Sequence, residues 1–316
     1  MTAPPPDSSP AAAAAPAAAS SSRAVRGSPR GQQAAVGRGI LCMIAGSALL
    51  TSSDAVVKWL TDDLPVGQIM VLRGLVVMAI LSAVLAGGRQ LHALKVHNRR
   101  DLALRALMVV LATFLFLVGL RYMPLADATA IAFATPLFTT ALAVPLLGEQ
   151  VGWRRWTAVV VGFGGVLLAA QPSGSGIAWA ALLPLGAALC AALRDIATRR
   201  LHLTEASLGI LFYTSAAVTL SGLVTLPWGW AAVSLEAWGL LALSGLVMTG
   251  AHWFQIEAFR YADTATVAPF RYFALVWAVV LGLLIWGDLP GWTVTAGILV
   301  IAGSGLYIWH REVRVR

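Results

Sequence analysis

Charged residues are scarce in this chain of 316 residues, of which only 11% are Asp, Glu, Lys or Arg while 59% are hydrophobic. Soluble globular chains carry about 25% charged residues, so the composition excludes an ordinary soluble domain and indicates that the lipid bilayer is the solvent. Apolar stretches of about the length that crosses ~30 Å of hydrocarbon recur along the chain. We expect ten transmembrane helices, near 39–60, 66–87, 102–120, 127–147, 156–171, 177–198, 207–229, 238–258, 264–287 and 291–309.

Several motifs of enzymes and pumps are also missing. The sequence has no G-x-x-x-x-G-K-[ST] phosphate loop, no H-E-x-x-H and no G-x-S-x-G, which argues against an ATP-driven pump and an intramembrane hydrolase. The only two cysteines, Cys42 and Cys190, both fall inside predicted spans, which argues against a disulfide framework or a metal site. We therefore expect no catalytic residues, no cofactor and no metal.

Positive charge gathers on alternate connections between the spans. The opposite connections carry Asp62, Asp63, Glu236 and Asp288, with Arg121 as their single cation. Because cytoplasmic loops are enriched in Lys and Arg, this pattern predicts that both termini are cytoplasmic. The net charge of +8 follows this membrane pattern, so a nucleic-acid partner is not expected. The cytoplasmic set contains Arg23, Arg26, Arg30, Arg38, Arg89, Lys95, Arg99, Arg100, Arg154, Arg155, Arg199, Arg200, Arg260, Arg311, Arg314 and Arg316.

Two halves of the chain repeat each other. A shift of 139 positions lays residues 121–164 on residues 260–303 without a gap, and a shift of 141 positions lays Asp54 on Asp195 and Lys58 on Arg199. Because each half holds an odd number of spans, the second half enters the membrane the opposite way up. The sequence thus predicts an all-α membrane protein of two inverted five-helix repeats, an arrangement typical of alternating-access transporters.

The ends of the chain differ from the repeats. Residues 1–37 are rich in Ala, Pro and Ser, and such a segment cannot bury a core, so we expect a disordered cytoplasmic tail. An organellar transit peptide is the alternative interpretation, because the segment carries Arg and almost no acid. The repeats are expected at 38–171 and 177–310, followed by a basic cytoplasmic tail at 311–316.

The chain resembles the drug/metabolite transporter superfamily, and specifically permeases with two EamA-type repeats. The features that carry this resemblance are the ten-span duplication, the run ADATAIAFATPLFTTALAVPLLGE at 126–149, its degenerate copy at 264–288, and the intramembrane Arg73. The resemblance implies a multi-pass protein of the bacterial inner membrane, with a central cavity lined by spans one to four and six to nine. Spans five and ten would lie at the periphery, where the runs GFGG at 162–165 and GSG at 303–305 suit close packing within the chain or a homodimer face.

Charged residues inside spans are the best sequence signal for a transport pathway, because they are costly in lipid unless paired or hydrated. Asp54 and Arg73 are expected at the same depth near the outer face, and Asp195 and Arg271 at the same depth near the inner face. Each couple is interpreted as an ion pair, which would act either as a gate or as a static link between helices. Arg105 and Arg194 are interpreted as anchors or packing partners rather than ligand contacts.

The eighth span differs from its copy in a way that a symmetric scaffold does not require. His252 replaces Thr113, and Gln255 replaces Phe116. We therefore predict that His252, Gln255 and Trp253 contact substrate, although hydrogen bonding between buried polar groups is the simpler alternative. Arg73, Thr135, Arg271 and Tyr272 complete the expected substrate site, in which an aromatic ring could stack on a planar or cationic compound.

These features together predict a secondary transporter that moves a small organic metabolite by alternating access. An amino acid, a vitamin such as riboflavin, or a related compound is the expected substrate, and a multidrug or cationic-metabolite exporter is the alternative. A channel or a signalling or scaffold protein is the non-transporter alternative. Coupling to protons would use an intramembrane acid or His252, the side chain that titrates most readily near neutral pH.

Overall fold

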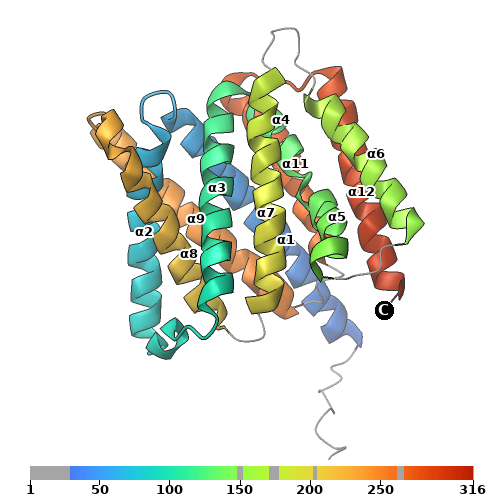
Figure 1. Cartoon of the computed structure of the whole chain (residues 1–316), viewed down its shortest axis with the longest axis horizontal. Helices are drawn as coiled ribbons and strands as arrows, with labels where there is room; N and C mark the ends of the chain where they lie inside the picture. Colours follow the sequence, from blue (N-terminus) through green and yellow to red (C-terminus); the bar gives the residue numbers. More distant parts are fainter. Residues whose placement is uncertain (1–28, 148–151, 171–177, 202–204, 262–266, 316) are drawn as a thin grey trace, which may run out of the picture.

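A computed structural model describes residues 29–147, 152–170, 178–201, 205–261 and 267–315 of the chain. Its described part is a bundle of helices without a β-strand (Figure 1). The first half contains α1 (Pro29–Leu60), α2 (Val66–Gly87), the 3-10 helix η1 (Leu91–Leu94), α3 (Arg99–Tyr122), α4 (Leu125–Ala132), α5 (Thr135–Leu147) and α6 (Trp153–Ala170). The second half contains η2 (Ala178–Ala181), α7 (Leu182–Leu201), α8 (Ser207–Gly222), η3 (Leu223–Trp228), α9 (Leu235–Tyr261), η4 (Ala268–Tyr272), α11 (Phe273–Trp286) and α12 (Trp292–Val315).

The helices match the expectation of a membrane protein. Judged by length and composition, seven helical segments among the described residues are long and apolar enough to cross a bilayer. Three shorter apolar helices, Trp156–Ala169, Phe270–Trp286 and Trp292–Tyr307, lie where the remaining spans were expected. Large apolar side chains such as Leu167, Leu246 and Leu284 are 68%, 60% and 74% exposed on the outside of the bundle. Such a surface suits lipid rather than water.

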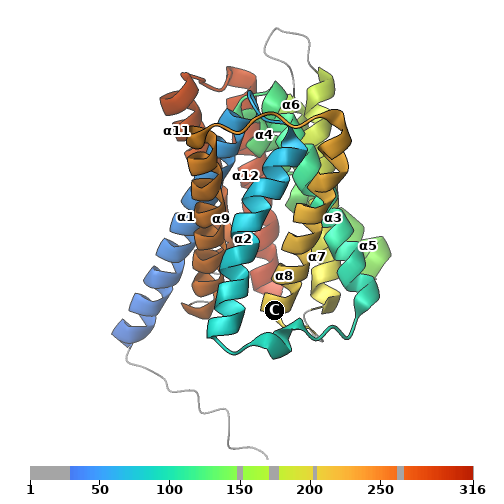
Figure 2. The same cartoon turned by 90° about the vertical axis from the view of Figure 1, so that its left-hand side faces the viewer.

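The two halves pack through elements that correspond to each other under the repeat. Helix α1 packs along α9, and its counterpart α7 packs along α3, the counterpart of α9. Two further contacts join a helix to its own copy, α2 to α8 and α6 to α12, while α11 packs on α1 and α4. Figure 1 places α6 and α12 at one edge of the bundle and α2 and α8 at the opposite edge, which faces the viewer in Figure 2.

Small residues allow the contact between α6 and α12. A Cβ atom added at Gly297 would lie 2.6 Å from the carbonyl oxygen of Gly165, and one added at Gly165 would lie 2.9 Å from Val300. The glycine run 162–165 therefore serves packing inside the chain. Gly164 and Gly303, by contrast, have no neighbouring atom within 4 Å of an added Cβ and face outward.

Two expected boundaries differ in the structure. Helix α1 begins at Pro29, so residues 29–37 of the expected disordered tail are helical, whereas residues 1–28 lie outside the described part. Helix α12 likewise continues to Val315 through most of the expected basic tail. In both cases a hydrogen-bonded helix extends beyond its apolar stretch, because polar residues can continue a helix once it has formed.

One connection at an end of the bundle is fixed by a carboxylate. Glu205, whose side chain is 4% exposed, accepts hydrogen bonds from the backbone amides of Asn98 at 2.6 Å and of His97 at 2.7 Å. These amides precede α3, where the positive end of the helix favours a negative charge. The amide of Asn98, together with that of His97, holds the pKa of Glu205 below its ordinary value, although burial opposes this shift.

Candidate functional site

A cavity of about 460 Å³ lies inside the bundle. Small-molecule sites typically measure about 300–1,000 Å³, so this cavity has room for a metabolite. We call it the central cavity. Its lining comes from both halves of the chain: Met43, Ser47, Leu50, Thr51, Asp54, Phe116, Thr129, Ala132, Phe133, Thr135, Pro136, Thr139, Thr140, Arg194, Asp195, Gln255, Arg271, Tyr272, Ala274 and Gly305.

Both copies of the repeat break their helix beside the central cavity. The fourth expected span is interrupted between α4 and α5, just before Pro136, and in the other copy the 3-10 helix η4, which contains Pro269, directly precedes α11. Proline removes a backbone donor, and Thr135 offers its hydroxyl to the carbonyl of Ala132 at 2.8 Å. Pro184, by contrast, lies in the first turn of α7, where a proline is tolerated.

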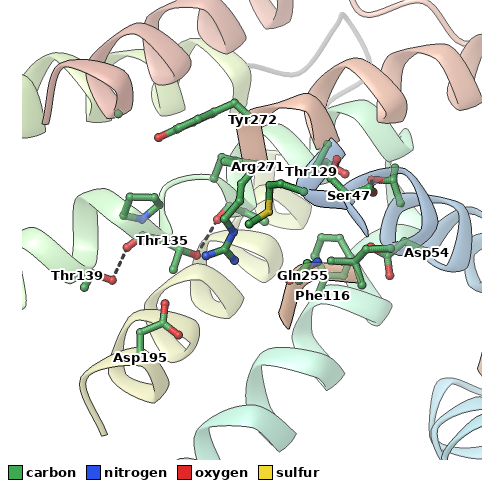
Figure 3. A pocket seen from close by; sticks show the side chains of 18 of the residues that line it. Ser47, Asp54, Phe116, Thr129, Thr135, Thr139, Asp195, Gln255, Arg271 and Tyr272 are labelled. Atoms are coloured by element: carbon green, nitrogen blue, oxygen red, sulfur yellow. Dashed lines mark hydrogen bonds between the residues drawn. The ribbon is translucent and has the colours of Figure 1, made fainter. Parts of the chain in front are cut away.

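The charged side chains of the central cavity are arranged asymmetrically. Figure 3 shows Thr135, Thr139 and Asp195 on one side of the view and Ser47 and Asp54 on the other, with Arg271 between the two groups. Asp195 forms an ion pair with its neighbour Arg194, in which Oδ1 of Asp195 lies 2.8 Å from Nη2 of Arg194.

The two ion pairs expected from depth are not formed in this structure. In the described part of the chain, neither Asp54 nor Arg271 has an ion-pair or hydrogen-bond partner, and Arg73 lines a different cavity from Asp54. The members of each expected couple interact electrostatically, Asp54 with Arg73 and Asp195 with Arg271, but equal depth does not bring them into direct contact. For Asp195, the adjacent Arg194 supplies the cation.

A second cavity, of about 120 Å³, lies between α2, α3, α7, α8 and α9. We call it the arginine cavity, because Arg73, Arg105 and Arg194 line it together with His252. The Nδ1 atom of His252 lies 2.8 Å from the carbonyl oxygen of Met248, so Nδ1 carries the proton of this hydrogen bond. Arg194 lines both cavities and forms part of the wall between them.

The structure therefore divides the expected substrate residues into three groups. Thr135, Gln255, Arg271 and Tyr272 line the central cavity, as do Asp54 and Asp195. His252 and Arg73 line the arginine cavity. Trp253 is 59% exposed and lines neither cavity.

Several cavity residues were not singled out from the sequence. Ser47 and Thr51 are four residues apart on α1, and Thr139 and Thr140 lie in α5, where each hydroxyl donates to a carbonyl one turn earlier. The sequence signal that could have identified these cavity residues was the presence of several hydroxyl side chains on one face of an apolar span. Arg194 was expected to be an anchor, yet it lines both cavities.

No group of His, Cys, Asp or Glu side chains that could hold a metal ion occurs among the residues that the structure describes. The polar groups of the central cavity are instead hydroxyls, one amide and both signs of charge. Such a set can bind a polar organic molecule by hydrogen bonds and ionic contacts.

Known proteins share this architecture. A solved crystal structure matches the fold over 90% of this chain and 99% of its own, with a TM-score of 0.57 at 17% identity. An S-adenosylmethionine uptake transporter of Rickettsia prowazekii is 29% identical over 70% of this chain and 75% of that protein. A riboflavin transporter of Rhizobium johnstonii is 31% identical over 71% of this chain and 74% of that protein. The pseudopaline exporter CntI of Pseudomonas aeruginosa is 27% identical over 83% of this chain and 93% of that protein.

The two halves of the chain also match one family model separately. The model of the EamA-like transporter family covers residues 37–171 and again residues 178–309. These matches include every residue that lines the central and arginine cavities. The protein, with its two matched halves around one central cavity, belongs to the EamA-like transporter family.

Proposed function

We propose that this protein is a secondary transporter that carries a small zwitterionic metabolite across the bacterial inner membrane, with the central cavity as its substrate site. The observation that carries the proposal is that Asp54 and Arg271 line one cavity and that neither forms an ion pair or a hydrogen bond within the described chain, so that only longer-range interactions with Arg73 and Asp195 offset their charges. Unpaired charges of opposite sign are costly inside a membrane bundle. A substrate with an ammonium and a carboxylate group compensates both.

The lining of the cavity suggests what else the substrate carries. Phe116, Phe133 and Tyr272 offer aromatic surfaces, while Thr135 and Gln255 offer hydrogen bonds. An amino acid joined to a planar ring fits this set, and S-adenosylmethionine, the substrate named for one relative, has both parts. The amino-acid end would bind Asp54 and Arg271, and the ring would pack on the aromatic side chains.

A neutral vitamin is the second candidate, because another relative is named as a riboflavin transporter. Its flavin ring would use the same aromatic surfaces, but it would leave Asp54 and Arg271 without ionic partners. The contact pattern of the cavity therefore favours the zwitterion.

Alternating access forms part of this proposal. Ten spans in two inverted repeats, with both termini cytoplasmic, would place the helix breaks of both copies beside one cavity. The pairing of α1 with α9 and of α7 with α3 supports two equivalent halves that move against each other. We further propose coupling to a proton gradient, and a homodimer through the outward faces of α6 and α12 that carry Gly164 and Gly303.

An exchange assay tests the proposal. Vesicles that contain the purified chain are loaded with unlabelled S-adenosylmethionine, riboflavin or an amino acid, and entry of the labelled compound is followed with and without an imposed pH gradient. We expect saturable exchange of a zwitterion that depends on Asp54 and Arg271 of the central cavity. If riboflavin exchanges and no zwitterion does, the assignment of Asp54 and Arg271 to substrate charges is wrong.

A further inference from the structure

The arginine cavity has an imbalance of charge that the proposed transport of a zwitterion does not explain. Three guanidinium groups and one imidazole line it, and no carboxylate does among the described residues. Asp195 pairs with one of these cations, Arg194, at 2.8 Å. Arg73 and Arg105 form no ion pair among the described residues, and they interact only at longer range with Asp54 and Asp195, respectively.

Arg73 is the most isolated of these cations. Its side chain is 5% exposed, and in the part of the chain that the structure describes it forms no hydrogen bond and no ion pair. A buried guanidinium normally satisfies its five donors with carboxylates, carbonyls or water. Here the polar groups beside it in the cavity include the hydroxyls of Thr214 and Ser215, and Thr214 already donates to the carbonyl of Ile210 at 2.7 Å.

Arg105 is also incompletely satisfied. Its Nε atom donates to the hydroxyl of Thr198 at 2.8 Å, but its buried Nη1 atom has no hydrogen-bond partner. Buried donors without partners are rare in folded proteins, and a bound ion or water molecule is a common explanation. The two incompletely satisfied cations line the same small cavity.

The repeat shows that the positive charges of Arg105 and Arg194 are not needed for helix packing. Under the shifts of 139 and 141 positions, Arg105 corresponds to Ser244 and Arg194 corresponds to Ser53. Ser53 and Ser244 meet at the contact of α1 with α9, with their hydroxyl oxygens 3.0 Å apart. The equivalent contact of α7 with α3 carries two arginines, although two small residues are sufficient for the same packing in the other copy.

We infer that the arginine cavity is a binding site for a small anion, held chiefly by Arg73 and Arg105. An anion supplies the missing negative charge and the missing acceptors together. A cavity of about 120 Å³ has room for a small anion such as chloride, formate or acetate. The negative group is either a free ion or an acidic group that the substrate extends past Arg194.

Binding is tested on the purified full-length chain in detergent. Thermal unfolding is measured while gluconate, a larger organic anion, is replaced by chloride or acetate at constant ionic strength and pH. We expect a saturable rise in unfolding temperature for the unmodified protein. The rise is lost in Arg73→Gln, largely kept in the charge-conserving Arg73→Lys, and unchanged in Arg121→Gln, which removes an exposed cation from the last turn of α3.

The dependence of one result on the medium separates an anion site from a purely structural arginine. The stability lost in Arg73→Gln should be smaller in gluconate than in chloride, because only in chloride does the substitution also remove a bound ion. Equilibrium dialysis with radiolabelled chloride should also show one site per chain that Arg105→Gln weakens at least tenfold. Equal chloride responses in Arg73→Gln and Arg121→Gln, or no saturable response at all, would overturn the inference.

A transport measurement identifies the source of the anion, and only this second experiment depends on the proposed function. If chloride competes with S-adenosylmethionine for exchange, the single carboxylate of the substrate occupies the arginine cavity instead of binding Arg271. If chloride stabilises the protein through Arg73 without competing, a free ion is the occupant. The binding experiment succeeds or fails without transport, so failure of the anion site and failure of the transport proposal are distinguishable.

Discussion

Phe133 and Tyr272, which occupy the same position in the two copies of the repeat, lie against each other at the central cavity with ring centroids 5.0 Å apart. The next residues back, Ala132 and Arg271, also correspond, and both line the cavity. The equivalent positions of the two halves therefore meet at the site itself. The site is asymmetric because the same backbone position carries a methyl group in one copy and a guanidinium in the other.

The position of the Tyr272 ring depends on Gly305 in α12. A Cβ atom added at Gly305 would clash with the hydroxyl and ring of Tyr272, whereas one added at Gly303 would meet nothing within 4 Å. We expect Gly305→Ala to lower stability by about 1–3 kcal/mol, as overpacking does, and to reduce exchange of substrate. Gly303→Ala is the matched control and should change both little. The comparison is made by thermal unfolding and vesicle exchange, and equal effects of the two variants would contradict this assignment.

Two neighbours on α9 offer a test of which face of the helix meets substrate. Gln255 lines the central cavity, while Trp253 is 59% exposed and lines no cavity. Gln255→Ala should raise the KM for exchange by about 2- to 10-fold, the loss expected for one hydrogen bond of about 0.5–1.5 kcal/mol. Trp253→Ala should leave KM unchanged within error. The reverse ranking would restore Trp253 as a substrate contact.

Contact between α6 and α12 leads to a prediction about stability and assembly. Gly297→Leu should lower the unfolding temperature by several degrees, because even a Cβ atom there would lie 2.7 Å from the amide nitrogen of Ala169. Gly164→Leu should leave the unfolding temperature nearly unchanged, because this glycine faces outward. If these outward faces form the proposed homodimer, Gly164→Leu shifts the protein to monomers in size-exclusion chromatography with light scattering. An unchanged mass would exclude that dimer face.

The lowered pKa of Glu205 leads to a prediction of how the stability of the protein depends on pH. Its pKa is lowered in the folded protein by the amides of Asn98 and His97, so the unfolded chain takes up a proton first as pH falls. The stabilisation is complete above the ordinary pKa of a glutamate and is lost as pH falls through the lower pKa of the folded state. We expect Glu205→Gln to unfold a few degrees lower at neutral pH and to show a smaller loss of stability on acidification. Parallel pH profiles for the two proteins would show that this carboxylate contributes nothing.

The positions of helices could be predicted well from the sequence, because apolar runs of membrane length are themselves the physical requirement for a span. The helix breaks near Pro136 and Pro269 could also be predicted, since proline removes a donor and disturbs the preceding turn. The start of α1 at Pro29 could not, because composition does not decide where a helix that is already formed stops extending.

The candidate site was predicted less completely, and the reason is the orientation of side chains. His252 and Gln255 lie three residues apart on one face of α9, so both were predicted to contact substrate. That face borders two cavities, and Gln255 lines the central cavity while His252 lines the arginine cavity. Asp54 and Arg73 were paired from their equal depth and the short turn between their helices, but these do not determine whether the two side chains come into direct contact. Arg194 was underestimated because the sequence does not show that two cavities meet beside it.

The most direct test of the central claim compares uptake of S-adenosylmethionine by vesicles that contain the unmodified protein, Asp54→Asn, Arg271→Gln or the control Arg121→Gln. We expect the unmodified protein and the control to transport alike. Each cavity variant should lose about 10-fold or more in apparent affinity, because a hydrogen bond to a charged group contributes roughly 1.5–3 kcal/mol. Saturable uptake that is equal in all four proteins would contradict the claim that Asp54 and Arg271 bind a zwitterionic substrate in the central cavity.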